Sequence, residues 1–157
     1  LYGLKLNPLR HGFALDRHSI VDPLFEICER YDKPILVHGQ SDMFNMPGKF
    51  DEMAETFPNV KIILAHIGEP DAIDAAIRVV NRRENVYVDT AGIQLSTLKR
   101  AVNEIDPNKI LMGTDAPWGD FNLSIELVEK ATEDEEIRQK ILGKNAARLF
   151  KLPINNV

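Results

Sequence analysis

Five short apolar segments, each followed by a stretch with helical periodicity, recur along the chain at intervals of roughly 24 to 32 residues. The segments predicted to form strands cover residues 2–7, 35–38, 61–66, 85–89 and 110–113. Strands that alternate with helices form parallel sheets, so the pattern predicts an α/β fold, either doubly wound or a (β/α) barrel of the TIM type. With 157 residues, the chain is expected to form a single domain, 1–157.

Apolar residues at helical spacing and local capping signals place the helices between these strands. Asp22 followed by Pro23 predicts the start of the first helix, and Asn145 is the expected N-cap of the last one. The predicted helices cover residues 22–31, 50–57, 71–81, 96–105, 123–131, 135–142 and 145–150. Residues 10–18 and 39–48 remain as loops that are long enough to carry functional side chains.

Charge, hydropathy and motif content exclude several classes of protein. A net charge of -5 and a pI near 5.4 argue against a nucleic acid or an anionic membrane as partner. No apolar run approaches the roughly 20 residues that span a bilayer. No Gly-x-Gly-x-x-Gly follows a predicted strand, so a dinucleotide cofactor has no support. The single cysteine, Cys28, cannot form an internal disulfide, and a cytoplasmic location is the expectation.

Three of the five predicted strands end on a side chain that can bind metal. His38 and His66 end two of them, and the strand that begins at Ile110 runs into Asp115. In parallel α/β folds the carboxyl ends of the strands hold ligands, so the three residues are expected to meet at one rim. Neutral imidazoles and a carboxylate suit a divalent metal, with zinc as the expected ion. Packing roles for the histidines and a turn-capping role for Asp115 are the structural alternatives.

Four stretches in this order resemble one family. His38, His66 and Asp115 lie in Val-His-Gly, Ile-Leu-Ala-His-Ile-Gly and Leu-Met-Gly-Thr-Asp-Ala-Pro-Trp, and residues 141–150 form a similar tail. Together they resemble the amidohydrolase superfamily, above all its metal-dependent branch that includes aminocarboxymuconate semialdehyde decarboxylase. The resemblance covers nearly the whole chain and implies a TIM barrel of which this chain would supply strands four to eight.

The resemblance also implies roles for the three residues. His38, at the end of strand five, would be a metal ligand. His66, at the end of strand six, would be the catalytic acid or base of mononuclear members, or the ligand of a second metal in others. Asp115, at the end of strand eight, would be a metal ligand or the base that activates water.

One departure from the superfamily concerns its first strand, which supplies a His-x-His pair to the metal. The histidines here are His11, His18, His38 and His66, and no two are separated by a single residue. His11 and His18 are expected to be solvated loop residues. Five βα units, and a chain that opens on Leu1, predict a partial barrel, since a whole one needs about 250 residues. Metal binding and activity would then depend on strands one to three.

Further residues are interpreted from their places on the predicted strands and loops. Lys5 lies on strand four, where binuclear superfamily members carry a carboxylated lysine, although mononuclear members share its sequence context without that role. Asp89 ends strand seven and either supports the site, faces the substrate or caps its turn. Trp118, Phe44 and Met46 either line a substrate pocket or pack over the barrel mouth.

Three functional hypotheses remain open. The first is a metal-dependent hydrolase, in which metal-activated water attacks an amide, ester or lactone carbon of a small molecule while His66 or Asp115 moves protons. The second is non-oxidative decarboxylation of a small unsaturated or aromatic acid at the same metal. An arginine that holds a carboxylate would favour it, and Arg10 is the loop candidate. The third is a catalytically inert half-barrel whose open sheet edges pair with another chain, as a homodimer or otherwise.

Overall fold

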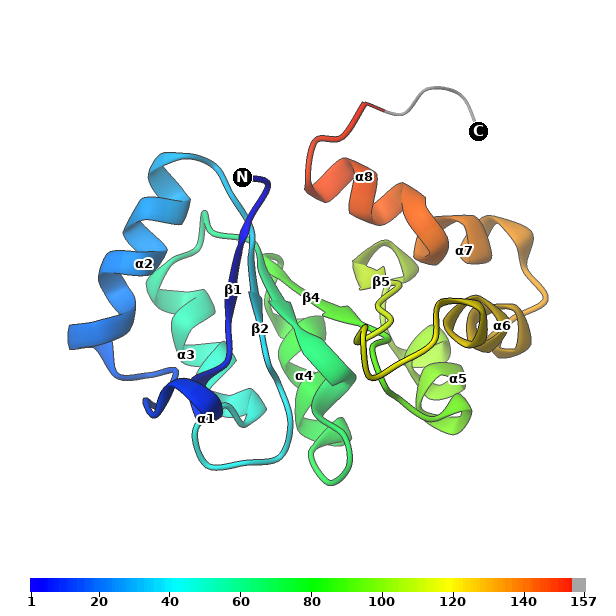
Figure 1. Ribbon diagram of the computed structural model, residues 1–157, viewed down its shortest axis with the longest axis horizontal. Coiled ribbons are helices and arrows are strands. Elements are labelled where there is room, and N and C mark those ends of the chain that lie inside the picture. The colour runs from blue at the N-terminus through cyan, green and yellow to red at the C-terminus, as the bar shows by residue number, and fades with distance from the viewer. Residues whose placement is uncertain (154–157) are drawn as a thin grey trace.

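The computed structural model describes residues 1–153 and contains one parallel five-stranded sheet with helices packed against it (Figure 1). The strands are β1 (Leu4–Leu6), β2 (Ile35–Val37), β3 (Ile62–Leu64), β4 (Val86–Asp89) and β5 (Ile110–Leu111). Each strand pairs with the next one along the chain. A doubly wound sheet reverses its strand order at a switch point, whereas a barrel does not. The order therefore favours the barrel and confirms the predicted α/β class.

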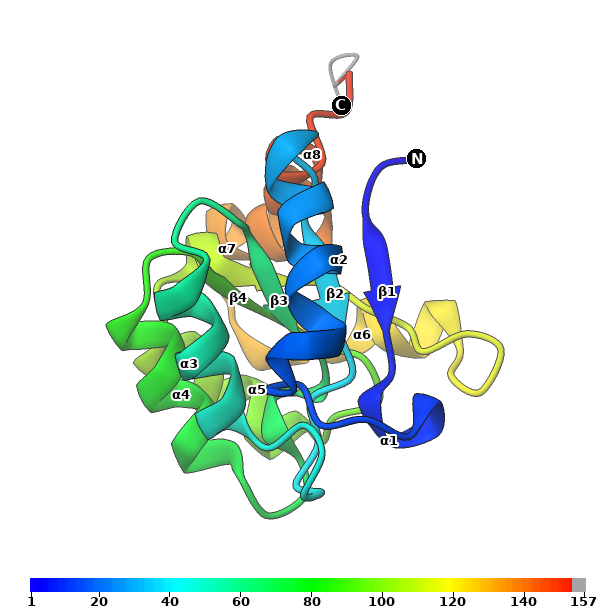
Figure 2. The same ribbon diagram turned by 90° about the vertical axis from the view of Figure 1, so that its left-hand side faces the viewer.

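Helices and short helical turns connect the strands. They are α1 (Pro8–His11), α2 (His18–Arg30), α3 (Pro47–Thr56), η1 (Ala65–Gly68), α4 (Ile73–Arg82), α5 (Leu95–Glu104), η2 (Pro107–Lys109), α6 (Phe121–Ala131), α7 (Glu135–Gln139), the π-helical turn η3 (Lys140–Lys144) and α8 (Asn145–Leu149). Figure 2 shows α2, α3 and α4 side by side on one face of the sheet. Within residues 1–153, no helix has both the length and the apolar character needed to cross a membrane.

The two faces of the sheet have different partners because alternate side chains of a strand point to opposite faces. The outer face belongs to the main core under the helices, with Leu6, Val37, Leu64, Val88 and Ile110 among its members. The inner face forms a second, smaller cluster that packs against α8 and the residue after it. Its members include Leu36, Ile63, Tyr87, Leu111, Leu149 and Phe150.

The register of the strands places Lys5 on this inner face as well. Lys5 pairs with Leu36, and Leu36 pairs with Ile63. Phe150 lies beside the amino end of β1, because a Cβ on Gly3, the residue before β1, would lie 3.3 Å from the ring of Phe150. The helix α8 therefore covers the amino-terminal part of the inner face (Figure 1), and the carboxyl-terminal part is left to polar side chains.

The predicted start of the first long helix was wrong. The helix α2 begins at His18, one turn before Asp22, and Pro23 lies inside it. Asp22 does not cap the helix because Oδ1 of its carboxylate lies 2.8 Å from Nδ1 of His18. Pro23 has no backbone N–H, so α2 lacks the helical bond to the carbonyl of Ser19.

The predicted N-cap at Asn145 was also wrong. Its backbone is helical, with φ -66° and ψ -46°, because η3 carries the helical backbone past Gly143. The buried amide of Asn145 instead donates to the carbonyl oxygens of Pro107, at 2.7 Å, and Ile110, at 2.8 Å. Asn145 thus joins the last helix to the start of β5.

Candidate active site

The carboxyl ends of four neighbouring strands deliver polar side chains to the same end of the sheet. His38 follows β2, His66 lies in η1 after β3, Asp89 ends β4, and Asp115 lies on the loop after β5. Because all strands run in one direction, these four residues emerge at one rim, as the sequence predicted for His38, His66 and Asp115.

The two histidines are in direct contact. Their ring centroids lie 4.7 Å apart with the planes at 73°, and Nε2 of His66 is 3.0 Å from Nδ1 of His38. Nδ1 of His66 is 2.7 Å from the carbonyl oxygen of Ala91. A carbonyl oxygen only accepts, so Nδ1 of His66 carries the proton, and its Nε2 accepts from Nδ1–H of His38.

This assignment determines the partner of the remaining nitrogen. Nε2 of His38 then carries no proton in the neutral ring, and the atom placed 3.0 Å from it is Oε1 of Gln40, which as an acceptor cannot bond a bare nitrogen. The amide must therefore turn its NH₂ group toward His38, since the O and N ends of an amide are chosen from their partners. The result is a chain of directed hydrogen bonds, from Gln40 through His38 to His66 and Ala91.

The surroundings of His38 favour its neutral form. Burial lowers the pKa of His38 below its ordinary value, and the neighbouring His66 and Lys5 lower it further. The charge of Asp42 acts in the opposite direction on this pKa. A neutral imidazole is the form that can bind a metal or pass on a proton.

Asp115 lies close to His66, across Gly92. A Cβ built on Gly92 would lie 3.8 Å from Nδ1 of His66 and 4.0 Å from Oδ2 of Asp115, so both side chains border one small space. The backbone carbonyl of Asp115 accepts from the N–H groups of Trp118, at 2.9 Å, and Gly119, at 3.2 Å. These bonds hold the loop that carries the carboxylate.

The backbone is strained at this rim. His66, Ile67 and Asp115 have φ values of 63°, 47° and 57°, in the left-handed region that L-residues seldom adopt. Each such residue costs roughly 1–3 kcal/mol and persists only where the surrounding structure imposes it. Two of the three predicted site residues are thus held in conformations that local preference opposes.

Lys5 and Asp89 complete the polar part of the inner face. Although Lys5 keeps contact with solvent, the protein around it desolvates its amine and lowers its pKa, against the charges of Asp89 and Asp115. Asp89 is buried, and burial raises its pKa even though its carboxylate accepts N–H groups from His66 and Ala91. Only the end position of Asp89 on its strand hinted at this environment.

Glu69 is a buried carboxylate that sequence reasoning missed. Its Oε1 accepts the backbone N–H of Gln94 at 3.0 Å, and its own N–H bonds the carbonyl of His66 at 2.9 Å. The available signal was its place on the tight exit loop, three residues after His66.

The other candidates lie around the mouth. Trp118 is 76% exposed, and the guanidinium of Arg10 lies over its ring at 5.9 Å from the centroid. Met46 is exposed, whereas Phe44 is partly buried and its carbonyl accepts from Leu15 at 2.8 Å. Trp118 and Arg10 therefore face solvent at the rim, while Phe44 holds its loop in place. His11 is exposed, as expected for a solvated loop residue.

His18 departs from the expectation of a solvated loop residue. It is the first residue of α2, and its two ring nitrogens contact two carboxylates, those of Asp22 at 2.8 Å and Glu52 at 3.0 Å. The side chain thus links α2 to α3, away from the rim.

The donors at the rim suit a divalent metal but do not form a complete site. Within residues 1–153, no three His, Cys, Asp or Glu side chains are grouped closely enough to hold an ion. His38 offers an unprotonated nitrogen and Asp115 a carboxylate, which are ligand types that zinc and manganese accept. A metal held here therefore needs at least one ligand beyond this arrangement.

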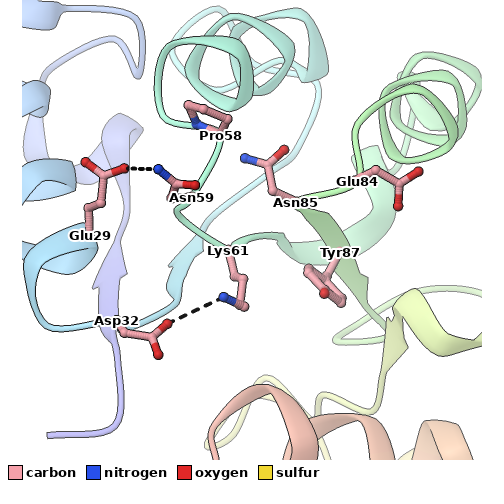
Figure 3. Close-up of a pocket in the computed structure, with 8 residues that line it drawn as sticks. All are labelled: Glu29, Asp32, Pro58, Asn59, Lys61, Glu84, Asn85 and Tyr87. Atoms are coloured by element: carbon pink, nitrogen blue, oxygen red, sulfur yellow. Dashed lines mark hydrogen bonds and ion pairs between the residues drawn. The ribbon is translucent and has the colours of Figure 1, made fainter.

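A hollow of about 600 Å³ lies at the opposite end of the sheet (Figure 3). Lys61 and Asn85, which line it, precede β3 and β4, so it lies at the amino ends of the strands. In barrel enzymes that end is not where the chemistry occurs. The size of this hollow therefore does not make it the candidate active site.

Comparison with known proteins agrees with this geometry. The sequence profile described as amidohydrolase matches residues 1–152, so the chain belongs to the amidohydrolase family. It is 32% identical over 125 residues to gamma-resorcylate decarboxylase from Rhodococcus jostii, a match that covers 67% of this chain and 37% of that protein. It is 24% identical to dihydroorotase from Buchnera aphidicola, covering 98% of this chain and 60% of that protein.

Solved structures show the same fold at lower identity. An uncharacterized TIM-barrel protein from Bordetella bronchiseptica matches with a TM-score of 0.75 and 21% identity, over 89% of this chain and 53% of that one. Dihydroxybenzoic acid decarboxylase from Polaromonas, solved with bound manganese and the inhibitor 2-nitroresorcinol, matches with a TM-score of 0.66 and 22% identity. This match covers 92% of this chain and 56% of that one. The five-stranded sheet is therefore part of a TIM-type barrel, and the chain spans little more than half of these structures.

Proposed function

We propose that the protein to which this chain belongs catalyses the metal-dependent, non-oxidative decarboxylation of a small aromatic acid. The observation that carries the proposal is the 32% identity to gamma-resorcylate decarboxylase over two thirds of this chain. In such a reaction the bond between the ring carbon and the carboxyl carbon breaks, carbon dioxide leaves, and a proton takes its place on the ring. The site must therefore hold a carboxylate and deliver one proton.

The residues at the rim fit these two tasks. His66 is the group proposed to hold and deliver the proton, because its ring is fixed at Nδ1 by Ala91 and its Nε2 lies 3.0 Å from Nδ1 of His38, which can exchange a proton with it. Arg10 supplies a guanidinium at the mouth, which suits a carboxylate, and the ring of Trp118 beside it offers an aromatic surface. The substrate is thus a small molecule that combines a negative charge with a flat ring.

A divalent metal is part of the proposal. His38 and Asp115 are the residues that would hold it, together with ligands from beyond this arrangement, and we propose zinc. Manganese, which is bound in the Polaromonas structure, is the alternative ion. When bound, the metal would act as a Lewis acid that polarises oxygen atoms of the substrate. A cytoplasmic location remains our proposal and is compatible with the free, buried thiol of Cys28.

The test is to assay the chain, and any longer product of the same coding region, after loading with zinc or manganese. The compound to supply first is 2,6-dihydroxybenzoate, which is bound in another similar solved structure. Release of carbon dioxide with formation of 1,3-dihydroxybenzene is expected. Absence of both across a panel of metal ions and hydroxybenzoates would exclude aromatic decarboxylation.

Hydrolysis is the second candidate, and the match to dihydroorotase over 98% of this chain favours it. In that case His66 or Asp115 would move the protons while water attacks an amide, ester or lactone carbon. Opening of the dihydroorotate ring, without release of carbon dioxide from hydroxybenzoates, would support hydrolysis over decarboxylation.

A further inference from the structure

The buried carboxylate of Asp89 makes contacts that the proposed chemistry does not itself use. Its Oδ1 accepts two backbone N–H groups, that of His66 at 2.9 Å and that of Ala91 at 3.1 Å. The carbonyl of Ala91 in turn accepts the ring proton at Nδ1 of His66, at 2.7 Å. Asp89, Ala91 and His66 therefore form a closed set of three hydrogen bonds.

We infer that Asp89 is a positioning residue, which fixes both the backbone turn and the ring tautomer of His66. One oxygen atom binds both the backbone that carries the imidazole and the backbone that supplies its acceptor. The distance between the two backbone segments, and with it the aim of Nε2, therefore depends on a single side chain.

The strain of the turn explains why such a residue is needed. His66, Ile67 and Gly68 follow one another with φ values of 63°, 47° and 74°, and Ile67 is branched at Cβ. A free chain would leave this conformation, because L-residues disfavour it. The bond from the N–H of His66 to Asp89 holds the first residue of the turn in place.

The surroundings of Asp89 leave room for the carboxylate and little else. It is 7% exposed, and a Cβ on Gly113 would lie 3.2 Å from its Cγ. Gly113, two residues after β5, therefore makes the space that the carboxyl group occupies. The buried carboxylate therefore has donors for its hydrogen bonds in the two N–H groups of His66 and Ala91.

The first experiment reads the ring of His66 directly and needs no activity. Two-bond nitrogen–proton NMR spectra of the 157-residue chain distinguish a protonated ring nitrogen from a bare one. We expect one tautomer for His66, with the proton on Nδ1, in the wild type and in Asp89→Asn, which keeps the acceptor oxygen. In Asp89→Ala and Asp89→Leu, we expect exchange between both tautomers.

Thr90→Val is the matched control. Thr90 is also buried, and its hydroxyl accepts the N–H of Gly113 at 3.1 Å, but no hydrogen bond joins it to His66. This variant should lose stability and keep the tautomer of His66. Retention of the single Nδ1–H tautomer in Asp89→Ala or Asp89→Leu would overturn the inference. If neither variant folds, loss of that tautomer in folded Asp89→Asn overturns it instead.

A kinetic experiment extends the inference to catalysis and rests on the proposed function. Misplacing a catalytic group by about 1 Å costs on the order of 100-fold in rate. Asp89→Leu should therefore lose roughly 10- to 100-fold in kcat with little change in KM, and Asp89→Asn should recover most of it. An equal loss in Thr90→Val would contradict a specific role for Asp89. Absence of activity in the wild type would count against the proposed function and leave the NMR result standing.

Discussion

At the rim, hydrogen bonds between residues far apart in the sequence determine which ring nitrogens of the two histidines carry protons. The carbonyl of Ala91 determines which nitrogen of His66 carries a proton, and His66 then determines the same for His38. A neutral His38 ring is also what burial favours. One prediction at the scale of single residues concerns His38 at this rim, and a second concerns His18, away from it.

Replacing His38 should weaken metal binding. In the complete protein, His38→Ala removes a proposed ligand, and the affinity for zinc or manganese should fall by at least the roughly 10- to 100-fold seen for outer-sphere partners. Asp115→Asn should lower kcat more than metal content if Asp115 acts mainly as a base. Metal analysis beside kinetics measures both. Full activity of metal-depleted His38→Ala would rule out this arrangement.

His18 should make stability depend on pH. Its two ring nitrogens contact the carboxylates of Glu52 and Asp22. The hydrogen bond to Glu52 raises the pKa of His18 most, and the one to Asp22 raises it further. Because the folded pKa is raised, the stabilising contribution is complete below about pH 6.5 and is lost as the pH rises through the folded pKa. Solvent screening keeps the effect small, since the side chain of His18 is 40% exposed.

The measurement is the melting temperature of His18→Gln and wild type across this range. The difference between them should be largest at low pH and shrink above neutrality. His11→Gln is the control, because among residues 1–153 the ring of His11 forms no ion pair and contacts the backbone N–H of Asn7, at 3.4 Å, and the ring of Phe13. A difference that grows with pH would show that His18 does not stabilise the fold as a cation.

At the scale of elements, each face of the sheet has its own role. The outer row of side chains packs under the helices, and the inner row is covered by α8 at the amino end only. Polar groups therefore gather at the carboxyl end of the inner face, which no apolar helix within residues 1–153 covers. The position of α8 rests on Asn145 and on the apolar contacts of Leu149 and Phe150.

Asn145→Ala should destabilise the protein by about 2–4 kcal/mol, because the buried carbonyl of Ile110 and the partly buried carbonyl of Pro107 each lose the Asn145 amide as a donor. Chemical denaturation measures the change in the free energy of unfolding. Asn103→Ala, at an exposed position of α5, should stay within about 0.5 kcal/mol of wild type. Equal effects of the two substitutions would refute the role given to the Asn145 amide.

At the scale of the whole molecule, the sheet has two open edges. Within residues 1–153, β1 and β5 each pair with one strand, so each presents an unpaired row of backbone groups. An apolar hollow of about 520 Å³ lies beside β1 and is lined by Leu1, Gly3, Leu4, Leu24, Ile27, Cys28, Tyr31 and Lys33. Exposed edges and apolar patches of this kind favour association.

The chain made alone should therefore associate in solution through these edges. Light scattering across a concentration series should show a mass that rises with concentration. Ile27→Glu, which places a charge in the hollow beside β1, should reduce association. Ile20→Glu is the matched control, since Ile20 is an exposed isoleucine of the same helix that does not line the hollow. A compact monomer that melts cooperatively and binds one zinc tightly would contradict this prediction.

The sequence by itself determined the alternation of strands and helices and the end of the sheet at which the polar side chains of the candidate site gather. Both follow from local patterns. An apolar run that ends on His38 or His66 records where a buried strand meets the rim, and parallel strands bring such ends together. Two predicted helix starts were wrong, because Asp22 bonds His18 instead of capping a helix and because η3 continues past Gly143.

Only the tertiary structure decided which polar groups bind each other. Asn145 bonds the carbonyl of Ile110, His38 bonds His66, and Asp89 holds the turn that carries His66. No local pattern encodes these pairs, because a buried polar group takes its partner from whichever distant segment packs beside it. The periodicity of apolar residues therefore determines where strands and helices form and which strand ends make up the rim. The partners of buried polar groups determine how the side chains at that rim are oriented.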